Sequence, residues 1–309
     1  MYMPIIRPKA LRPGDQVAIV APAGPVDLRD DFERGVAALE RMGFGVRYRD
    51  RIFHSLRYLA GSDEERAEEL MCSFEDPEIR AVVSLRGGYG CSRLIPLLDQ
   101  GRLRNHCKVF MGFSDVTTLH MFFRRRFGWV TFHGPMATSA ALGSVGGAQI
   151  EHLRALWTEP EYVPTLSFPQ LQSWVPGYAE GELTGGCLSL IVASLGTSYE
   201  PPTDGKILFL EDLGEPPYRV DRMLTQLKLA HKLDRVAGLL LGNFLDCEPT
   251  SGGYTLEETL RELVCDLEIP VMANFPAGHG PENWALPLGA RMGLDTSNRA
   301  LRFLESSIA

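Results

Sequence analysis

The sequence predicts an α/β protein with two domains, the first larger than the second. In the first half, short apolar runs alternate with segments of helical periodicity, which indicates strands joined by helices. A proline-rich segment interrupts this alternation near the middle of the chain, and the alternation then resumes. The length of 309 residues is compatible with one large domain or two ordinary ones.

The first half contains five predicted strands, each a short apolar run that ends in a turn. They cover residues 16–21, 45–49, 81–85, 108–112 and 129–132, with helices between them over 31–42, 62–74, 91–98 and 116–125. The second helix opens with the capping box Ser62-Asp-Glu-Glu65. This alternation favours a flavodoxin-like parallel sheet, in which ligands bind beyond the carboxyl ends of the strands. We therefore expect the turns after Ala21, Leu85 and Gly112 to lie near one another.

A segment without clear periodicity separates the two halves. Residues 159–180 contain four prolines, so we interpret them as a linker between an N-terminal domain, 1–158, and a C-terminal domain, 181–309. The smaller C-terminal domain is also expected to be α/β. Its predicted strands cover 206–210 and 236–241, and its predicted helices cover 220–229 and 256–264.

Charge and cysteine content exclude several functional classes. Lys and Arg number 31 against 39 Asp and Glu, a net charge of −8, which argues against nucleic-acid and anionic-membrane partners. The six cysteines form no CxxC pair, and their wide spacing is typical of reduced thiols in the cytosol. The N-terminus shows no signal-peptide pattern, and no apolar run approaches the roughly 20 residues of a membrane helix. We expect a cytoplasmic protein.

The segment Gly112-Phe-Ser-Asp115 follows a predicted strand and precedes a predicted helix. A sharp turn at this place exposes a serine hydroxyl and directs main-chain N–H groups toward a developing oxyanion. Ser114 is therefore a candidate nucleophile, although the segment lacks the second glycine of the GxSxG pattern. The alternative is that Ser114 only caps the helix that follows.

The glycine-rich segment Arg86-Gly-Gly-Tyr-Gly90 also follows a predicted strand. Glycines at such a turn allow close approach of the main chain to a ligand, or serve as a structural turn alone. The segment matches neither GxGxxG nor the Walker A pattern, so a nucleotide-dependent enzyme is not supported. We expect no cofactor.

Two further segments carry groups that complete a serine hydrolase. Glu211 and Asp212 come directly after an apolar strand, and His279 lies in the Gly- and Pro-rich segment 276–281. A histidine is the usual base for a serine, and a carboxylate commonly orients it. No HExxH pair or dense cluster of His, Asp and Glu suggests a metal. These residues favour a metal-free hydrolase.

Short motifs along nearly the whole chain resemble those of the serine LD-carboxypeptidase family, which includes muramoyl-tetrapeptide carboxypeptidases and microcin C immunity peptidases. Each motif is loose alone, but chance agreement in this order and at these separations is improbable. The motifs are Leu11-Arg-Pro-Gly-Asp15, Val20-Ala-Pro22, Arg86-Gly-Gly-Tyr-Gly90, Arg93-Leu94, Gly112-Phe-Ser-Asp115, His133-Gly-Pro135, Gly185-Gly186, Leu210-Glu-Asp212, Asp221-Arg222-Met-Leu224 and Gly278-His279.

The resemblance implies roles for matching residues. Ser114 would be the nucleophile, Glu211 the triad carboxylate and His279 the general base. Main-chain N–H groups of Asp115 and of Gly88, in the Gly87-Gly88 turn, would form the oxyanion hole. The site would then lie in the cleft between the domains, and homodimers are usual in the family.

Two positions qualify this assignment. Glu215, in the turn Gly214-Glu-Pro-Pro, competes with Glu211 for the role of the acid, although it lies farther past the predicted strand. Where the family usually has Gly-Gly-Asn, this chain has Cys187 after Gly185-Gly186, and a thiol cannot replace the hydrogen bonds of an amide.

The implied substrate is a cytoplasmic murein tetrapeptide, cleaved at the L,D-peptide bond before its terminal D-alanine during peptidoglycan recycling. Arg86 is a candidate to bind the substrate carboxylate. Tyr89 and Trp284 are further candidate substrate-binding residues, which could stack on a base if the substrate is a peptidyl-nucleotide. Two alternatives stay open: a peptidase of the same fold that cleaves peptidyl-nucleotide antibiotics, and a non-catalytic binding protein.

Overall fold

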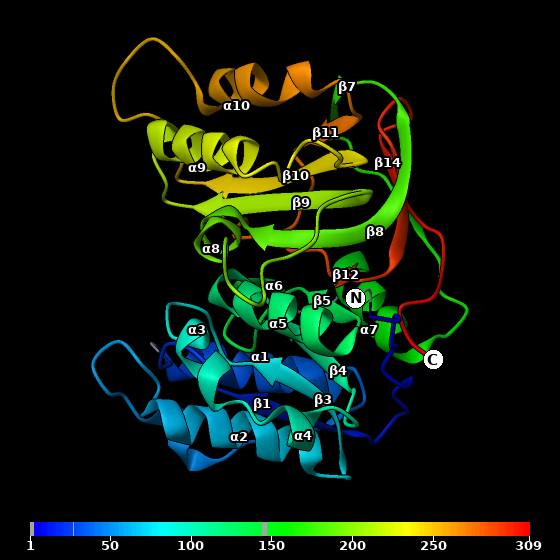
Figure 1. Ribbon diagram of the computed structural model, residues 1–309. Helices are drawn as coiled ribbons and strands as arrows, with labels where there is room; N and C mark the ends of the chain where they lie inside the picture. Colours follow the sequence, from blue (N-terminus) through cyan, green and yellow to red (C-terminus); the bar gives the residue numbers. More distant parts are fainter. Residues whose placement is uncertain (1–2, 27, 144–146) are drawn as a thin grey trace. The chain divides into compact units, whose positions relative to one another are not determined.

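The computed structural model describes residues 3–26, 28–143 and 147–309, so the first two residues of the N-terminal segment considered above lie outside it. The chain forms two compact units. Unit 1 comprises Met1–Tyr162, Asn283–Pro287 and Ser307–Ala309, and unit 2 comprises Val163–Glu282 and Leu288–Ser306. Each unit has its own sheet (Figure 1), which confirms the predicted α/β fold class.

The sheet of unit 1 has the strand order β12-β5-β4-β3-β1-β2. The pairs β2–β1, β1–β3, β3–β4 and β4–β5 are all parallel, which is the flavodoxin-like order. All five strands predicted for the first half are therefore present. Their bounds are β1 (Gln16–Val20), β2 (Gly45–Arg47), β3 (Ile79–Ser84), β4 (Val109–Gly112), β5 (Thr131–His133) and β12 (Leu286–Leu288).

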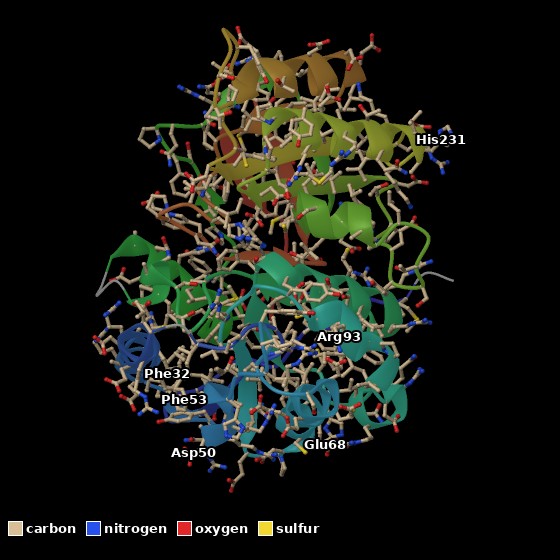
Figure 2. All side chains as sticks on the ribbon, turned by 90° about the vertical axis from the view of Figure 1, so that its left-hand side faces the viewer. Phe32, Asp50, Phe53, Glu68, Arg93 and His231 are labelled. Carbon is tan, nitrogen blue, oxygen red and sulfur yellow. The ribbon has the colours of Figure 1, made fainter. Side chains whose placement is uncertain are left out.

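Helices connect these strands and cover the sheet of unit 1. Phe74 of α2 and Phe123 of α5 pack edge to face, with ring centroids 5.3 Å apart, so these two helices share a face of the sheet. Phe32 of α1 packs against Phe53 of η1, with ring centroids 5.2 Å apart (Figure 2). The bounds are α1 (Arg29–Arg41), η1 (Asp50–Phe53), α2 (Asp63–Glu75), α3 (Cys91–Leu94), η2 (Ile95–Leu97), α4 (Gln100–Leu103), η3 (Ser114–Val116), α5 (Thr117–Phe127), α6 (Ala140–Gly143) and α7 (Ala148–Thr158).

The capping box predicted for α2 is present. The Ser62 hydroxyl accepts a hydrogen bond from the Glu65 main-chain N–H, and the Glu65 carboxylate accepts one from the Ser62 main-chain N–H at 2.8 Å. These contacts satisfy N–H groups that the first turn of a helix leaves without partners. They begin α2 at Asp63, which sets which residues of the helix face the sheet.

Unit 2 is built on a mixed sheet with the strand order β6-β14-β13-β8-β9-β10-β11-β7. Strands β8 to β11 are parallel, and the strands outside them pair antiparallel. The strands are β6 (Thr165–Leu166), β7 (Gln172–Val175), β8 (Tyr178–Cys187), β9 (Lys206–Leu213), β10 (Gly238–Leu245), β11 (Val271–Ala273), β13 (Arg291–Asp295) and β14 (Ala300–Phe303). The helices are α8 (Leu188–Ala193), α9 (Pro217–Leu229), α10 (Leu256–Val264) and η4 (Cys265–Leu267).

The interpretation of residues 159–180 as a linker was wrong. They contain β6, β7 and the first residues of β8, and β6 and β7 form the two edges of the sheet of unit 2. Proline is tolerated beside short edge strands because their outer N–H groups need no partner in the sheet. Two of the four prolines, Pro164 and Pro176, directly flank β6 and β7.

The predicted C-terminal domain, 181–309, is not one continuous stretch of unit 2. Asn283–Pro287 and Ser307–Ala309 belong to unit 1. The last residue is held there by main-chain hydrogen bonds: Ala309 N–H donates to Pro8 O at 2.8 Å, and Ala10 N–H donates to Ala309 O at 2.9 Å. Local sequence periodicity does not show that these C-terminal segments belong to unit 1, because their place depends on pairing with distant segments.

Two further observations concern membrane-spanning helices and the cysteines. Within the described residues, no helix combines the length and apolar character needed to span a membrane. All six cysteines are free thiols.

Candidate active site

Ser114 lies on a strained turn between β4 and α5. Its φ of 61° is in the left-handed region, which residues other than glycine rarely adopt. The residues at the N-caps of η3 and α5 are Phe113 and Val116, and neither helix has a side-chain cap. Ser114 therefore does not act as the helix cap that was its alternative interpretation. The turn instead sets its side chain at the carboxyl end of β4.

The glycine-rich turn after β3 approaches Ser114 closely. A Cβ at position 87 would lie 2.8 Å from Ser114 Oγ and 3.6 Å from the Asp115 nitrogen, so only glycine fits there. Gly24 N–H donates to Gly87 O at 3.0 Å. The predicted proximity of the turns after Ala21, Leu85 and Gly112 is thus confirmed. Gly87 had no individual role in the sequence prediction, which named Gly88.

The three predicted substrate-binding residues occupy different surroundings in unit 1. The Arg86 guanidinium donates to Pro25 O at 3.1 Å, which holds the side chain over the turn after β1. Tyr89 is half exposed and packs beside Tyr58, with ring centroids 5.9 Å apart. Trp284 packs on His152, with ring centroids 5.2 Å apart. Tyr89 and Trp284 therefore belong to separate aromatic clusters.

Glu211 and His279 form a buried pair within unit 2. His279 Nδ1 lies 2.6 Å from Glu211 Oε2; the Glu211 side chain has no exposed surface, and that of His279 is 11% exposed. Glu211 lies within β9, which extends to Leu213, rather than after the strand as predicted. Asp212 faces away, as expected for a continuing strand, and accepts a hydrogen bond from Ser189 N–H at 2.8 Å.

Gly278 allows this pair to form. Its φ is 112°, and a Cβ there would collide with the Glu211 carboxylate. Main-chain hydrogen bonds hold the loop against β10, since Asn243 N–H donates to Ala277 O at 2.9 Å and Phe275 N–H donates to Leu241 O at 3.0 Å. The glycine before His279 is therefore required by the close approach of the loop to the carboxylate.

Electrostatics distinguish His279 from two other buried histidines. Burial by itself would lower the pKa of His279, but the hydrogen bond and charge of Glu211 raise it above the ordinary value of 6.5. Burial raises the pKa of Glu211 against the opposing effect of His279. Burial lowers the pKa of His120 and of His152 to about 4, because neither has a carboxylate partner that offsets it. His279 is thus suited to accept a proton near neutral pH.

The structure also places the two residues that qualified the assignment of the triad, Glu215 and Cys187. Glu215 lies near Arg219, with 3.4 Å between carboxylate and guanidinium, whereas the carboxylate at His279 is Glu211. Cys187 lies opposite Glu211 in the parallel pair of β8 and β9. Burial, and next the charge of Glu211, raise the pKa of the Cys187 thiol well above its ordinary value. A protonated thiol is a poor nucleophile, so Cys187 does not compete with Ser114.

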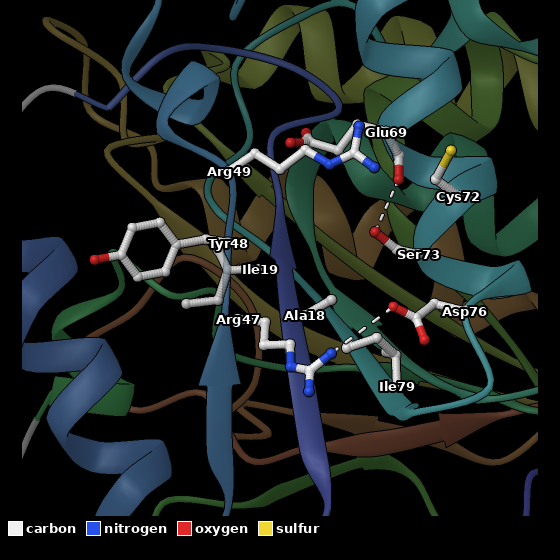
Figure 3. Close-up of a pocket in the computed structure, with 10 residues that line it drawn as sticks. All are labelled: Ala18, Ile19, Arg47, Tyr48, Arg49, Glu69, Cys72, Ser73, Asp76 and Ile79. Atoms are coloured by element: carbon white, nitrogen blue, oxygen red, sulfur yellow. Dashed lines mark hydrogen bonds and ion pairs between the residues drawn. The ribbon is translucent and has the colours of Figure 1, made fainter.

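A cavity of about 190 Å³ lies elsewhere in unit 1, between β1, β2 and α2 (Figure 3). None of the predicted site residues lines it. Its walls are Ala18, Ile19, Arg47, Tyr48, Arg49, Glu69, Cys72, Ser73, Asp76 and Ile79. Throughout the described ranges, no three His, Cys, Asp or Glu side chains are grouped so that they could hold a metal ion.

Comparisons with known proteins identify the family. Residues 17–134 match the LD-carboxypeptidase N-terminal domain, and residues 180–294 match the LD-carboxypeptidase C-terminal domain. The chain belongs to the LD-carboxypeptidase family. It is a serine-type LD-carboxypeptidase, a hydrolase, which confirms the resemblance inferred from the sequence.

Similar proteins match over nearly the full chain. A probable murein peptide carboxypeptidase of Bacillus subtilis is 38% identical over 296 residues, covering 95% of this chain and 92% of the relative. The murein tetrapeptide carboxypeptidase of Pseudomonas aeruginosa is 35% identical, covering 89% and 91%. The structure of the microcin C7 self-immunity protein MccF with glutamyl sulfamoyl guanosine has a TM-score of 0.89 at 25% identity, covering 98% and 99%.

Proposed function

We propose that this LD-carboxypeptidase hydrolyses the L,D-peptide bond before the terminal D-alanine of murein tetrapeptides, in peptidoglycan recycling. The observation that carries the proposed mechanism is the buried Glu211–His279 pair, whose 2.6 Å contact raises the proton affinity of the imidazole. The named activities of the Bacillus and Pseudomonas relatives support the choice of substrate.

In the proposed mechanism, His279 takes the proton of the Ser114 hydroxyl as Ser114 Oγ attacks the carbonyl carbon of the scissile bond. The main-chain N–H groups of Asp115 and Gly88 stabilise the resulting oxyanion. When the tetrahedral intermediate collapses, His279 gives its proton to the amine of the leaving D-alanine. Water then hydrolyses the acyl-enzyme by the same route. The mechanism requires the Ser114 hydroxyl and the His279 imidazole to meet during the reaction.

Glu211 has two roles in this proposal. It accepts the Nδ1 proton of His279, which leaves Nε2 free to accept the proton of the serine. It also stabilises the imidazolium ion that forms, because its carboxylate is held in a site without solvent. Arg86 is proposed to bind the terminal carboxylate of the substrate, and Tyr89 and Trp284 to contact its acyl portion.

The test is the release of D-alanine from muramyl-L-Ala-D-Glu-meso-diaminopimelyl-D-Ala by the purified protein, with Ser114→Ala measured alongside. In another serine hydrolase, loss of the nucleophile lowers kcat by about a millionfold, so release by Ser114→Ala is expected to be undetectable. Equal release by both proteins would reject Ser114. Absence of release by the wild-type protein would reject this substrate.

A second candidate substrate is a peptidyl-nucleotide. The likeness to MccF with a bound glutamyl sulfamoyl nucleoside favours it, and the exposed Tyr58–Tyr89 ring pair offers a surface on which a nucleobase can stack. Cleavage of glutamyl sulfamoyl adenosine, followed by chromatography, tests this candidate. A kcat/KM for it above that for the murein peptide would reverse the order of the two candidates.

We also propose that the protein acts in the cytoplasm as a homodimer. The free cysteines are consistent with a reducing compartment, and the homodimer rests on the family resemblance. Light scattering coupled to size-exclusion chromatography measures the mass directly. A mass equal to the 34.3 kDa of one chain, at micromolar concentration, would reject the dimer.

A further inference from the structure

An arginine at the first turns of α2 is completely buried below the turns that surround Ser114. Arg66 has 0% exposure, although arginine is rarely buried in full. Its Nη1 donates to two main-chain carbonyls, Pro22 O in the turn after β1 and Gly90 O in the turn after β3, the latter at 3.1 Å. One guanidinium therefore joins the ends of two neighbouring strands.

The peptide group between Gly90 and Cys91 is held by charge on both sides. Its carbonyl accepts from Arg66, and its N–H donates to Asp115 Oδ2 at 2.7 Å. Asp115 is 1% exposed and directly follows Ser114 in the chain. This single peptide thus links the glycine-rich turn, the serine turn and α2.

Burial of these charges is costly unless each is paired and hydrogen bonded. Asp63 pairs with Arg66 and also accepts from Arg93 Nε at 2.8 Å. Arg66 Nε remains buried without a hydrogen-bond partner in the described part of the chain. Apolar residues of similar volume often replace buried ion pairs without loss of stability, so stability alone does not explain an arginine here.

The clamped peptide is closely surrounded, so that no side chain fits on Gly87 or Gly90 of the turn. Gly90 has a φ of 137°, and a Cβ there would lie 2.6 Å from Arg66 Nη1. Three residues earlier, a Cβ on Gly87 would lie 2.8 Å from Ser114 Oγ. Because both glycines belong to one tightly packed turn, we expect a displacement of the Gly90–Cys91 peptide to shift the main chain that faces the serine.

We propose that Arg66 is a positioning residue that, together with Asp115, clamps the Gly90–Cys91 peptide and so holds the glycine-rich turn at the distance from Ser114 that an oxyanion hole requires. The inference rests on the proposed function, because it takes Ser114 as the nucleophile. Arg66 touches no reacting atom. It acts through main-chain geometry, and its loss is expected to affect the transition state more than substrate binding.

The test compares Arg66→Met and Arg66→Lys with a matched control, Lys108→Met. Lys108 likewise donates to two main-chain carbonyls, but these are Ser73 O in the last turn of α2 and Asp76 O at its C-cap, at the opposite end of the helix from Arg66. Three quantities are measured for each variant: kcat and KM for D-alanine release, the rate at which a fluorophosphonate labels Ser114, and the melting temperature. Mass spectrometry locates the label and gives the fraction of protein labelled.

We expect Arg66→Met to lower kcat and the labelling rate about 100-fold, the scale for loss of one oxyanion-hole donor, with KM changed by less than about twofold. Arg66→Lys keeps a cation and is expected to recover part of this loss; if Arg66→Met does not fold, Arg66→Lys decides. Lys108→Met is expected to label at the wild-type rate.

A purely structural role would lower the labelled fraction and leave the rate per labelled serine unchanged, and that result would overturn the proposal. Equal rates for Arg66→Lys and Lys108→Met would do so as well. If the fluorophosphonate labels Ser114 of the wild-type protein but no D-alanine is released, only the proposed substrate is rejected. The labelling rates of the variants then still test the role of Arg66. If the wild-type protein does not label at Ser114, the nucleophile and the clamp both fail.

Discussion

The two units use buried charge in different ways. In unit 1, the charged side chains of Arg66 and Asp115 are bonded to main-chain groups, which do not ionise near neutral pH. In unit 2, the buried charge of Glu211 is bonded to the ring of His279, which does exchange protons. In the proposed mechanism, residues of the first unit would supply the main-chain geometry around Ser114, and residues of the second would supply the proton chemistry of His279.

Two carboxyl groups make this difference specific. Burial raises the pKa of both Asp115 and Glu211. Asp115 accepts from the Cys91 N–H, whereas one oxygen of Glu211, Oε1, is buried without a hydrogen-bond partner in the described ranges. The carboxylate of Glu211 therefore depends on His279 for compensation, and this dependence is what raises the proton affinity of the ring.

The largest effect in this comparison is expected from Glu211→Gln. The amide keeps the shape of the side chain but loses the charge that stabilises the imidazolium ion and selects its tautomer. We expect kcat to fall about 10⁴-fold, as for the equivalent change in another serine triad. Steady-state release of D-alanine measures it. Glu215→Gln is the control and should retain activity; if it were the more damaging change, the acid would be Glu215.

A change in unit 1 tests the geometric part of the comparison. Gly87→Ala places a Cβ within 2.8 Å of Ser114 Oγ, so the turn must shift away from the serine. We expect kcat to fall between about 10²-fold and 10³-fold while the pH profile stays in place. Gly253→Ala is the control, since a Cβ there meets no atom within 4 Å. A shifted pH profile in Gly87→Ala would contradict the division of roles.

The raised pKa of His279 predicts the pH dependence of the reaction. In the proposed mechanism the neutral ring is the active base, so kcat/KM should decline as pH falls through a pKa above 6.5. Because folding raises this pKa, the pair stabilises the folded protein most below pH 6.5. That stabilisation is lost as pH rises through the pKa of the folded state.

Histidine NMR titration measures the pKa of His279 directly. In the same experiment, His120 and His152 are expected to titrate near 4.

If kcat/KM stays constant down to pH 6.5 and declines only through a pKa below that value, the assignment of His279 as the base would be contradicted. So would an unchanged His279 titration in Glu211→Gln, because the carboxylate charge is the cause of the raised pKa.

The smallest effect is expected from Cys187→Asn, which introduces an amide at the position paired with Glu211, where the thiol donates to Asp212 Oδ1 at 3.5 Å. If the longer amide reaches the carboxylate of Glu211, the new hydrogen bond would weaken the hold of that carboxylate on the imidazolium ion and lower the pKa of His279 by less than about one unit. The same NMR titration detects the shift. Cys187→Ser, which offers a shorter donor, is the control. A rise in the pKa of His279 in the Asn variant would show that the amide does not contact Glu211.

Local patterns in the sequence were sufficient for the α/β class, the strands of unit 1, the capping box of α2 and the family. They predicted the turns beside Ser114 because parallel strands present their carboxyl ends at one edge of a sheet. They also singled out Glu211 and His279, since a charged residue at the end of an apolar strand and a histidine between glycines depart from the surrounding pattern.

Other features depended on contacts between residues distant in the chain, which no local window contains. The edge strands β6 and β7 appeared as a linker because their pairing partners, β14 and β11, are more than 90 residues away. Arg66 looked like an ordinary polar residue of a helix because nothing in its neighbours shows that Gly90 O and Pro22 O lie above it. Sequence determined which groups are available for chemistry; the tertiary structure decided which of them are buried together, and burial sets both their pKa values and their geometry.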